Sequence, residues 1–534
     1  MADGARGRDG LERQIGTAAL LFTGISGIVG SGWLFASLYA AQHAGPAAII
    51  SWCIGGAVAI CLALVYAELG AMLPLAGAIA RIPLLSHGGM SGFMAGWLCW
   101  IAYVATAPIE VTAVLQYASN YVPWLTTTHG DERMLTPHGL MVAAVLLVAF
   151  LLINLAGVRW LARANSAITI WKLAIPVMAA VALIAVGCKA ANFTEYGGFA
   201  PAGIGGIFAA VSAGGVMFSL FGFRTAVDMA GEAKNPQTAV PLAIIGAVVI
   251  SLAIYILLQV AFIGAVPTAH LAQGWALLSE NVAGGPFAAF ATILGMQWLA
   301  ALLYFDAGLS PSGTALAYTG ATARINYALA KNQQFPKLFL RLNKARVPVW
   351  ALVFNFAVGF LLLLPFPGWS ELVGFISSAA VLSLAFGPVS LAALRHQQPH
   401  LPRPFKLQAG RVVSAVSLVL VGYVVYWTGW DTNWKVFALA GTGAVLLSLL
   451  HLHRGDFRTL HARQSLWFWL FVAGLAAVSY TGNYGNGLGL VGHGVDMAIV
   501  TVLALVTFWL AFRTRLSDAE CQSLFAADEM EPAG

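Results

Sequence analysis

Apolar residues form long blocks along almost the whole chain, separated by short polar or Pro/Gly-rich breaks. Many blocks exceed about 18 residues, the length that a helix needs to cross a bilayer. The blocks do not alternate with polar residues, so they predict helices and not the strands of a barrel. Fourteen segments are expected, near 15–42, 46–74, 91–121, 138–157, 164–188, 206–232, 239–265, 287–319, 347–365, 369–394, 412–429, 434–453, 466–481 and 493–512.

The composition agrees with a polytopic membrane protein. Hydrophobic residues make up 60% of the 534 residues and charged residues 9%, whereas soluble proteins carry about 25% charge. This excludes an ordinary soluble enzyme, a disordered chain and a disulfide-stapled secreted domain. The five cysteines show no metal-ligand spacing, and the chain has no phosphate loop, HExxH site or catalytic triad pattern. No metal, no cofactor and no enzymatic activity are therefore expected.

The net charge of +6 becomes informative once the charges are placed along the chain. With the N-terminus inside, 22 of the 27 Lys and Arg residues fall in inner segments and three in outer segments. This asymmetry is the positive-inside signal. It predicts a multi-pass protein of the cytoplasmic membrane with both termini cytoplasmic. The basic excess then reflects topology, so the lipid bilayer is an expected partner and nucleic acid is not.

A Pro-broken basic loop at 395–411 provides the one internal boundary that the sequence suggests. It predicts a ten-helix transport core over 15–394, four additional spans over 412–512, and cytoplasmic tails over 1–14 and 513–534. The polar stretch 323–348 predicts an amphipathic cytoplasmic helix with Leu, Phe and Ala on one face.

Two spans are interrupted by glycine. The segment 23–32 contains four glycines in ten residues, and 213–223 contains three; each glycine costs a helix about 1 kcal/mol relative to alanine. Close helix packing through small residues is one explanation. However, the clusters fall in the first and sixth spans, which correspond in two five-span halves. Paired interruptions of this kind indicate an inverted repeat with a midplane site. The freed N–H groups suit a carboxylate and the freed carbonyls an ammonium.

Motifs at these positions resemble those of a known family. Gly30-Ser-Gly-Trp-Leu-Phe35, preceded by Gly27, is similar to the first-helix signature of the amino acid–polyamine–organocation (APC) superfamily. The segments 221–236, ending in Glu-Ala-Lys-Asn-Pro, and 310–313 with 323–332 resemble its sixth-helix and eighth-helix motifs. The resemblance implies an all-α five-plus-five inverted repeat with broken helices 1 and 6, here with four extra C-terminal spans. It also implies secondary active amino acid transport by alternating access.

The predicted breaks and the family resemblance together imply that both breaks bind the substrate. Backbone N–H groups near Gly30, Ser31 and Gly32 are expected to bind the α-carboxylate of an amino acid. Backbone carbonyls in both breaks are expected to bind its ammonium, with the contacts drawn from Gly27, Ile28, Phe218, Ser219, Phe221 and Gly222.

Ionisable residues inside apolar spans are costly and therefore candidates for function. Lys172 lies about 12 Å into the fifth span and matches a lysine that replaces a sodium ion in several relatives. Asp306 in the eighth span could pair with it as a proton-coupling unit; a snorkelling lysine or a structural ion pair are the alternatives. Glu110, in the third span, could line the vestibule, relay protons or pair structurally. Glu68, at the inner end of the second span, is expected to be a structural cap or salt-bridge partner.

Arg224, directly after the sixth-helix break, departs from the pattern of most relatives. It could bind a second substrate carboxylate in a bidentate fork, or pair locally with Asp228 one turn later. Together with Asp306, it resembles the bacterial aspartate–proton symporter branch. The sequence therefore predicts a proton-coupled transporter of aspartate or glutamate in a bacterial inner membrane. A neutral amino acid importer or an exchanger is the alternative, and a transporter-like receptor is less favoured. The sequence does not indicate the oligomeric state.

Overall fold

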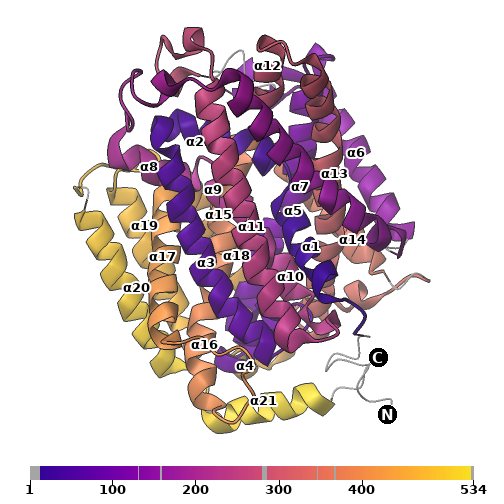
Figure 1. Ribbon diagram of the computed structural model, residues 1–534. Helices are drawn as coiled ribbons and strands as arrows, with labels where there is room; N and C mark the ends of the chain where they lie inside the picture. The colour runs from indigo at the N-terminus through magenta and orange to yellow at the C-terminus, as the bar shows by residue number, and fades with distance from the viewer. Residues whose placement is uncertain are drawn as a thin grey trace.

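A computed structural model describes residues 13–129, 132–156, 159–278, 285–344, 347–365, 368–492 and 494–530. The chain is built from long helices that run roughly side by side (Figure 1). Every one of the fourteen predicted segments contains helix. The first described helix, α1, begins toward the same end of the molecule at which the last helix, α21, lies (Figure 1).

The first span is broken, as its glycines predict. Helix α1 (Thr17–Ile28) stops, and α2 (Gly32–Ala44) begins after three residues of non-helical backbone. Val29 leaves the helical region with φ −85° and ψ 84°, which redirects the chain at the break. A 3₁₀ turn (Gly45–Ala47) then leads into the second span, α3 (Ala48–Met72).

The sixth span is broken as well. It consists of α8 (Gly203–Ser212), α9 (Val216–Leu220), a 3₁₀ turn over 221–223 and α10 (Arg224–Asp228). Helix α8 meets the rest of the span, Val216–Asp228, at an angle of 45°. Gly215 has φ +85°, a left-handed conformation that glycine adopts without strain. The break therefore depends on glycine at this position.

The two broken spans touch each other. A Cβ on Gly222 would overlap the backbone of Gly27, and a Cβ on Gly27 would lie 2.8 Å from the carbonyl oxygen of Gly222. The Thr225 hydroxyl donates hydrogen bonds to the carbonyls of Gly222 at 2.8 Å and Thr23 at 3.1 Å. Small residues thus let the two backbones meet, so both explanations for the glycines, unwinding and close packing, apply here.

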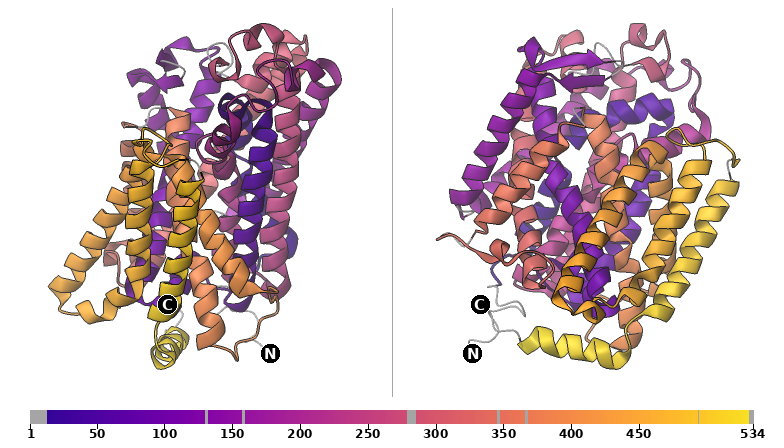
Figure 2. Two further views of the ribbon diagram at one scale, coloured as in Figure 1. Left: turned by 90° about the vertical axis from the view of Figure 1, so that its left-hand side faces the viewer. Right: turned by 180° about the vertical axis from the view of Figure 1, so that it is seen from behind.

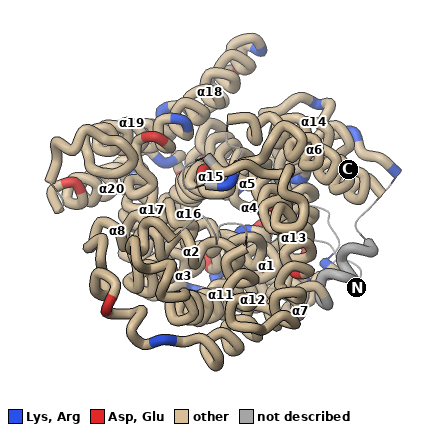
Figure 3. The backbone as a smooth tube through the Cα atoms, turned by 90° about the horizontal axis from the view of Figure 1, so that it is seen from above, with Lys and Arg blue, Asp and Glu red and all other residues tan. Residues whose placement is uncertain are grey.

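Long helices surround the crossing. They are α5 (Gly89–Ala118), α7 (Arg159–Gly187), α11 (Pro236–Ala265), α13 (Gln297–Lys331) and α15 (Trp369–Leu384). Helix α5 is buried along nearly its whole length, so it forms the centre of the bundle. Seen from above, α1 and α2 lie among these helices while α18, α19 and α20 lie toward the periphery (Figure 3).

The remaining elements connect or cover this core. The helices are α4 (Ala78–His87), α6 (Pro137–Ala156), α12 (Pro286–Ile293), α14 (Val349–Leu362) and α16 (Phe386–Gln397). The hairpin β1 (Thr126–His129) and β2 (Glu132–Leu135) pairs antiparallel, with Thr126 opposite Leu135. The predicted amphipathic helix over 323–348 is wrong: α13 continues straight through to Lys331, and a single 3₁₀ turn, Lys337–Leu340, follows.

The last helices form a group at one side of the core (Figure 2). They are α17 (Gly410–Thr428), α18 (Trp430–Arg454), α19 (Leu466–Thr481) and α20 (Val495–Thr514). Helix α21 (Asp518–Met530) follows and begins with a capping box: Ser517 N–H donates to the Glu520 carboxylate at 2.9 Å, and Glu520 N–H donates back to the Ser517 hydroxyl at 3.3 Å.

Within the described residues, nine helices are long and apolar enough to cross a membrane, or ten if the bent sixth span is counted as one. Helices α1 and α14 are apolar but shorter. The chain is therefore an all-α polytopic membrane protein. The number of fourteen spans, the inverted repeat and the division into core and additional spans stay predictions.

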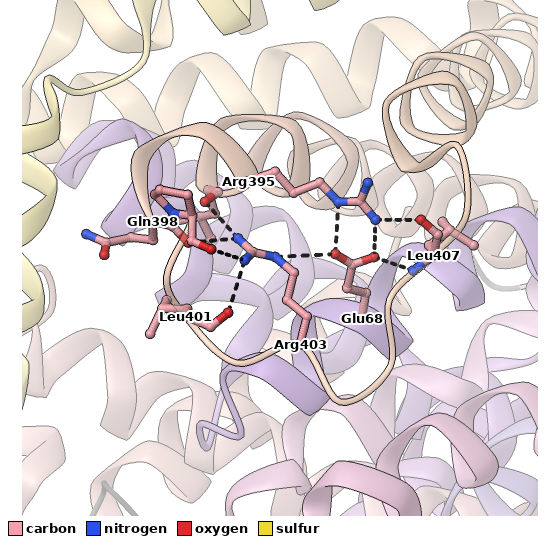
Figure 4. A network of polar contacts seen from close by, with 8 residues as sticks. Glu68, Arg395, Gln398, Leu401, Arg403 and Leu407 are labelled. Carbon is pink, nitrogen blue, oxygen red and sulfur yellow. Dashed lines mark hydrogen bonds and ion pairs between the residues drawn. The ribbon is translucent and has the colours of Figure 1, made fainter.

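An ion-pair network ties the loop after α16 to α3 (Figure 4). The fully buried Glu68 carboxylate accepts hydrogen bonds from Arg395 Nε at 2.9 Å and Nη2 at 2.5 Å, and from the Leu407 amide at 2.8 Å. Arg403 Nε lies 3.7 Å from the same carboxylate. Glu68 is thus a salt-bridge partner, which is one of the two structural roles expected from the sequence. Burial lowers the pKa of Arg403, against the attraction of Glu68.

Candidate functional site

A cavity lies where the two broken spans cross. Four of its lining residues come from the predicted breaks, Gly27 and Ile28 from the first and Phe218 and Phe221 from the sixth, and a fifth, Arg224, directly follows the sixth-span break. The other four are Thr106, Glu110, Tyr318 and Ile376. The space not filled by atoms, including the part open to solvent, is about 320 Å³. The structure therefore brings the two breaks together around one small cavity.

The remaining predicted break residues shape this region without lining the cavity. Gly32 packs against Ser219, because a Cβ on Gly32 would overlap the Ser219 hydroxyl. Gly222 packs against Gly27 in the same manner. The Ser31 hydroxyl accepts a hydrogen bond from Trp369 Nε1 at 2.9 Å, which fixes the break against α15.

Three lining residues were missed by sequence reasoning. Thr106 donates its hydroxyl to the Ala102 carbonyl one turn earlier at 2.9 Å, which is the ordinary behaviour of a buried helical threonine. Tyr318 follows the Ser310-Pro-Ser-Gly313 motif by two helical turns, so its face of α13 could have been extrapolated. Ile376 is one of many buried apolar residues on α15 and carries no signal in the sequence.

Arg224 is a buried guanidinium at the wall of the cavity, with 2% of its surface exposed. Its Nε donates to the Phe221 carbonyl at 3.2 Å, and its guanidinium carbon lies 4.8 Å from the centroid of the Tyr103 ring. Its Nη1 has no hydrogen-bond partner among the residues that the structure describes. A charged nitrogen in this state is costly unless a ligand pairs with it. Arg224 is thus placed to bind an anion.

The alternative partner of Arg224 is engaged elsewhere. One Asp228 oxygen accepts the Tyr103 hydroxyl at 2.7 Å. Across the described part of the chain, no ion pair within 4.0 Å joins Arg224 to Asp228. The Tyr103 ring lies against the Arg224 guanidinium, and the Tyr103 hydroxyl donates to the Asp228 carboxylate. Tyr103 therefore links the two charged residues.

Lys172 is fully buried and connects three helices. Its ammonium donates to the Thr314 hydroxyl of α13 at 2.7 Å and to the Ser26 carbonyl of α1 at 3.3 Å. Ser26 lies three residues before the first break, so the lysine holds the end of α1 against α7 and α13. The depth of Lys172 in the membrane stays a prediction.

Asp306 is also buried but has different partners. Its Oδ1 accepts the Trp171 indole N–H and the Ser310 hydroxyl, each at 2.7 Å. No ion pair within 4.0 Å joins it to Lys172 in the ranges that the structure covers. The two groups are nonetheless close enough to attract each other electrostatically. The expected direct Lys172–Asp306 contact is therefore replaced by an attraction across neighbouring helices.

Comparison with known proteins agrees with this geometry. The amino acid permease family model matches residues 15–447, most of the chain. The chain belongs to the amino acid permease family. It is therefore a multi-pass membrane transporter and not an enzyme, and its resemblance to the APC superfamily is confirmed.

Two bacterial relatives are similar over nearly their whole length. The glutamate/serine transporter AimA of Bacillus subtilis (strain 168) is 38% identical over 513 residues, covering 94% of each chain. The aspartate-proton symporter of the same organism is 37% identical over 509 residues, covering 94% of this chain and 96% of the relative. The branched-chain amino acid permease BcaP is more distant, at 24% identity over 439 residues.

Proposed function

We propose that this permease imports acidic amino acids together with protons, by alternating access around the crossing of the two broken spans. The observation that carries the proposal is Arg224, a buried guanidinium with an unpartnered Nη1 in the wall of the cavity. A dicarboxylic amino acid brings a second carboxylate that can complete its hydrogen bonding. The names of the two near-full-length relatives, an aspartate-proton symporter and a glutamate/serine transporter, support the same substrate class.

The rest of the substrate fits the two breaks. The amide of Ser31 at the start of α2 is suited to the α-carboxylate, with Gly30 and Gly32 on either side of it. Carbonyls at the end of α1 and around the 3₁₀ turn of the sixth span are suited to the ammonium. Gly27, Ile28, Phe218 and Phe221 line the cavity at these points. The α-amino acid unit would thus bridge both broken helices, with its side chain directed toward Arg224.

Proton coupling is assigned to Lys172 and Asp306. Lys172 contacts α1 next to the break, so a change in its charge alters how firmly α1 is held against α13. Asp306 attracts it from α13, two helical turns from Thr314. The setting is the cytoplasmic membrane of a bacterium, with both termini in the cytoplasm, the bilayer as surroundings and the oligomeric state open.

The test is uptake by the purified protein in liposomes. An inward proton gradient should drive accumulation of labelled aspartate and glutamate above equilibrium, and a protonophore should abolish it. Alanine and serine, assayed in parallel, separate an acidic transporter from a neutral amino acid importer. Uptake that requires amino acid inside the liposomes and does not depend on the proton gradient would instead identify an exchanger.

A further inference from the structure

A carboxylate of the protein itself occupies the first break. Glu110, on α5, accepts a hydrogen bond from the Ser31 amide at 2.7 Å through its Oε2. A Cβ built on Gly30 would lie 2.5 Å from Oε1 and 3.0 Å from Oε2, so the carboxylate lies directly against the unwound backbone. Glu110 is 1% exposed and lines the substrate cavity. The break therefore already holds a carboxyl group of the protein in this conformation.

The Glu110 carboxylate and a substrate carboxylate need the same donor. The amide of Ser31 can be the main donor for one carboxylate at a time, because both anions would otherwise lie within a few ångströms of each other. Like charges at such a separation in a poorly hydrated site strongly disfavour each other. Substrate entry therefore requires that Glu110 lose its charge or leave the amide.

Other ionisable groups determine how Glu110 responds. They face this region from four helices: Lys172 on α7, Arg224 on α10, Tyr255 on α11, and Asp306 and Tyr318 on α13. The Lys172 ammonium attracts the Glu110 carboxylate. The Tyr255 hydroxyl donates to the Ile28 carbonyl at 2.9 Å and so holds the end of α1. The Glu110 carboxylate interacts instead with the Ser31 amide and the Lys172 ammonium.

We propose that Glu110 is a built-in competitor for the substrate's α-carboxylate, which gives up the Ser31 amide when it takes up a proton. The proton adds to the Glu110 carboxylate, no other bond is made or broken, and the substrate carboxylate replaces it at the amide. The inference rests on the proposed amino acid site but not on its preference for acidic side chains, because every amino acid carries the α-carboxylate. Binding of substrate and binding of one proton then favour each other.

The experiment measures binding of L-aspartate and L-serine to the purified protein by titration calorimetry. Repeating each titration in buffers of different ionisation enthalpy gives the number of protons taken up. The wild type should take up about one proton per bound amino acid, and its affinity should fall up to about tenfold per pH unit above the titration point. Glu110→Gln, which cannot carry the competing charge, should bind both amino acids more tightly at pH 8 and lose most of this pH dependence.

Two further variants make the outcome specific. Glu110→Asp keeps a carboxylate and should keep the proton uptake, while its shorter stem weakens the contact with Ser31 and so raises the affinity partly. Glu371→Gln, at an exposed position in the first turn of α15, is the matched control and should behave as the wild type does. Thermal unfolding of each variant checks that it is folded. The proton count of the wild type shows whether a proton is taken up, and the loss of that uptake in Glu110→Gln assigns the proton to Glu110.

Several results would overturn the inference. It fails if the wild type binds amino acids without proton uptake, or if Glu110→Gln binds more weakly than the wild type at every pH. It also fails if the pH dependence is unchanged in Glu110→Gln. Binding of serine but not aspartate, with the expected Glu110 effect, would instead refute the acidic substrate and leave the role of Glu110 in place. Binding of no amino acid at all would refute both.

Discussion

Replacing Arg224 by alanine should convert an acidic amino acid site into one that barely distinguishes aspartate from alanine. The Arg224 side chain reaches the cavity with one unpartnered guanidinium nitrogen and a Tyr103 ring below it. A hydrogen bond to a charged group contributes about 1.5–3 kcal/mol. Its loss therefore corresponds to about ten- to a hundred-fold weaker binding of aspartate. Alanine lacks the second carboxylate and should lose far less.

The assay is competition of unlabelled aspartate and alanine against a labelled amino acid that the variant still binds. The quantity to compare is the ratio of the two affinities in the wild type and in each variant. Arg224→Lys keeps the charge but loses the planar fork, so it should recover part of the preference. Tyr103→Phe keeps the ring under Arg224 and removes only the hydroxyl on Asp228, so the ratio should stay near that of the wild type.

A ratio that is unchanged in Arg224→Ala would refute this reasoning. Arg224 would then serve the fold through Phe221, Tyr103 and the nearby Asp228. Equal losses for aspartate and alanine in a folded protein would also count against it, because they would indicate damage to the part of the site that all amino acids share. The thermal stability of each variant separates that result from unfolding.

Three further predictions concern other parts of the chain. Lys172→Ala should reduce proton-driven accumulation more than it reduces substrate binding. The effects of Lys172→Ala and Asp306→Ala should be strongly non-additive in a double-mutant cycle. If the two effects simply add, Lys172 and Asp306 do not act together in proton coupling. In a background without the five native cysteines, Trp124→Cys should react with an impermeant thiol reagent outside intact cells and His400→Cys should not; reversed labelling would refute the topology. Hydrogen bonds of the capping box lower the pKa of Glu520 below its ordinary 4.5, so α21 should be most stable at neutral pH and lose amide protection as the pH falls through that lowered value. Glu520→Gln should abolish this dependence in hydrogen-exchange measurements.

The broken spans could be predicted because their cause is local. Glycine clusters at 23–32 and 213–223 weaken helix wherever the chain folds, and both breaks appear there. The depth predicted for Lys172 rests on the same kind of argument, because 1.5 Å per residue converts a position in a span into a distance. The structure adds that this lysine is fully buried. The end of α13 could not be predicted in this way. Six of the nine residues of 323–331 are Ala, Leu, Arg or Lys, which are good helix formers, so the helix continues beyond the apolar segment to Lys331.

The partners of the ionisable residues depend on the tertiary arrangement, and here the sequence was less informative. Asp306 was expected to pair with Lys172, but Trp171 and Ser310 take its Oδ1 and Thr314 takes the lysine. Nothing in the sequence around Glu110 indicates that its carboxylate meets the Ser31 amide, 79 residues away. Predicting such contacts requires knowing which faces of two helices meet. These spans carry apolar residues on every side, so their sequence does not indicate which face meets which helix.

The Glu68 network has a mechanical consequence. Its carboxylate holds Arg395 at the end of α16 and the Leu407 amide shortly before α17, while Glu68 itself belongs to α3. The C-terminal end of α3 and the segment that leads into the last four helices are therefore coupled. During a transport cycle, α17 must either travel with α3, displacing the lipids around α17–α20, or break a buried ion pair at each turnover. The last four helices would thus resist movement of the core. The free energy of the Glu68 ion-pair network would determine how strongly they are coupled to it.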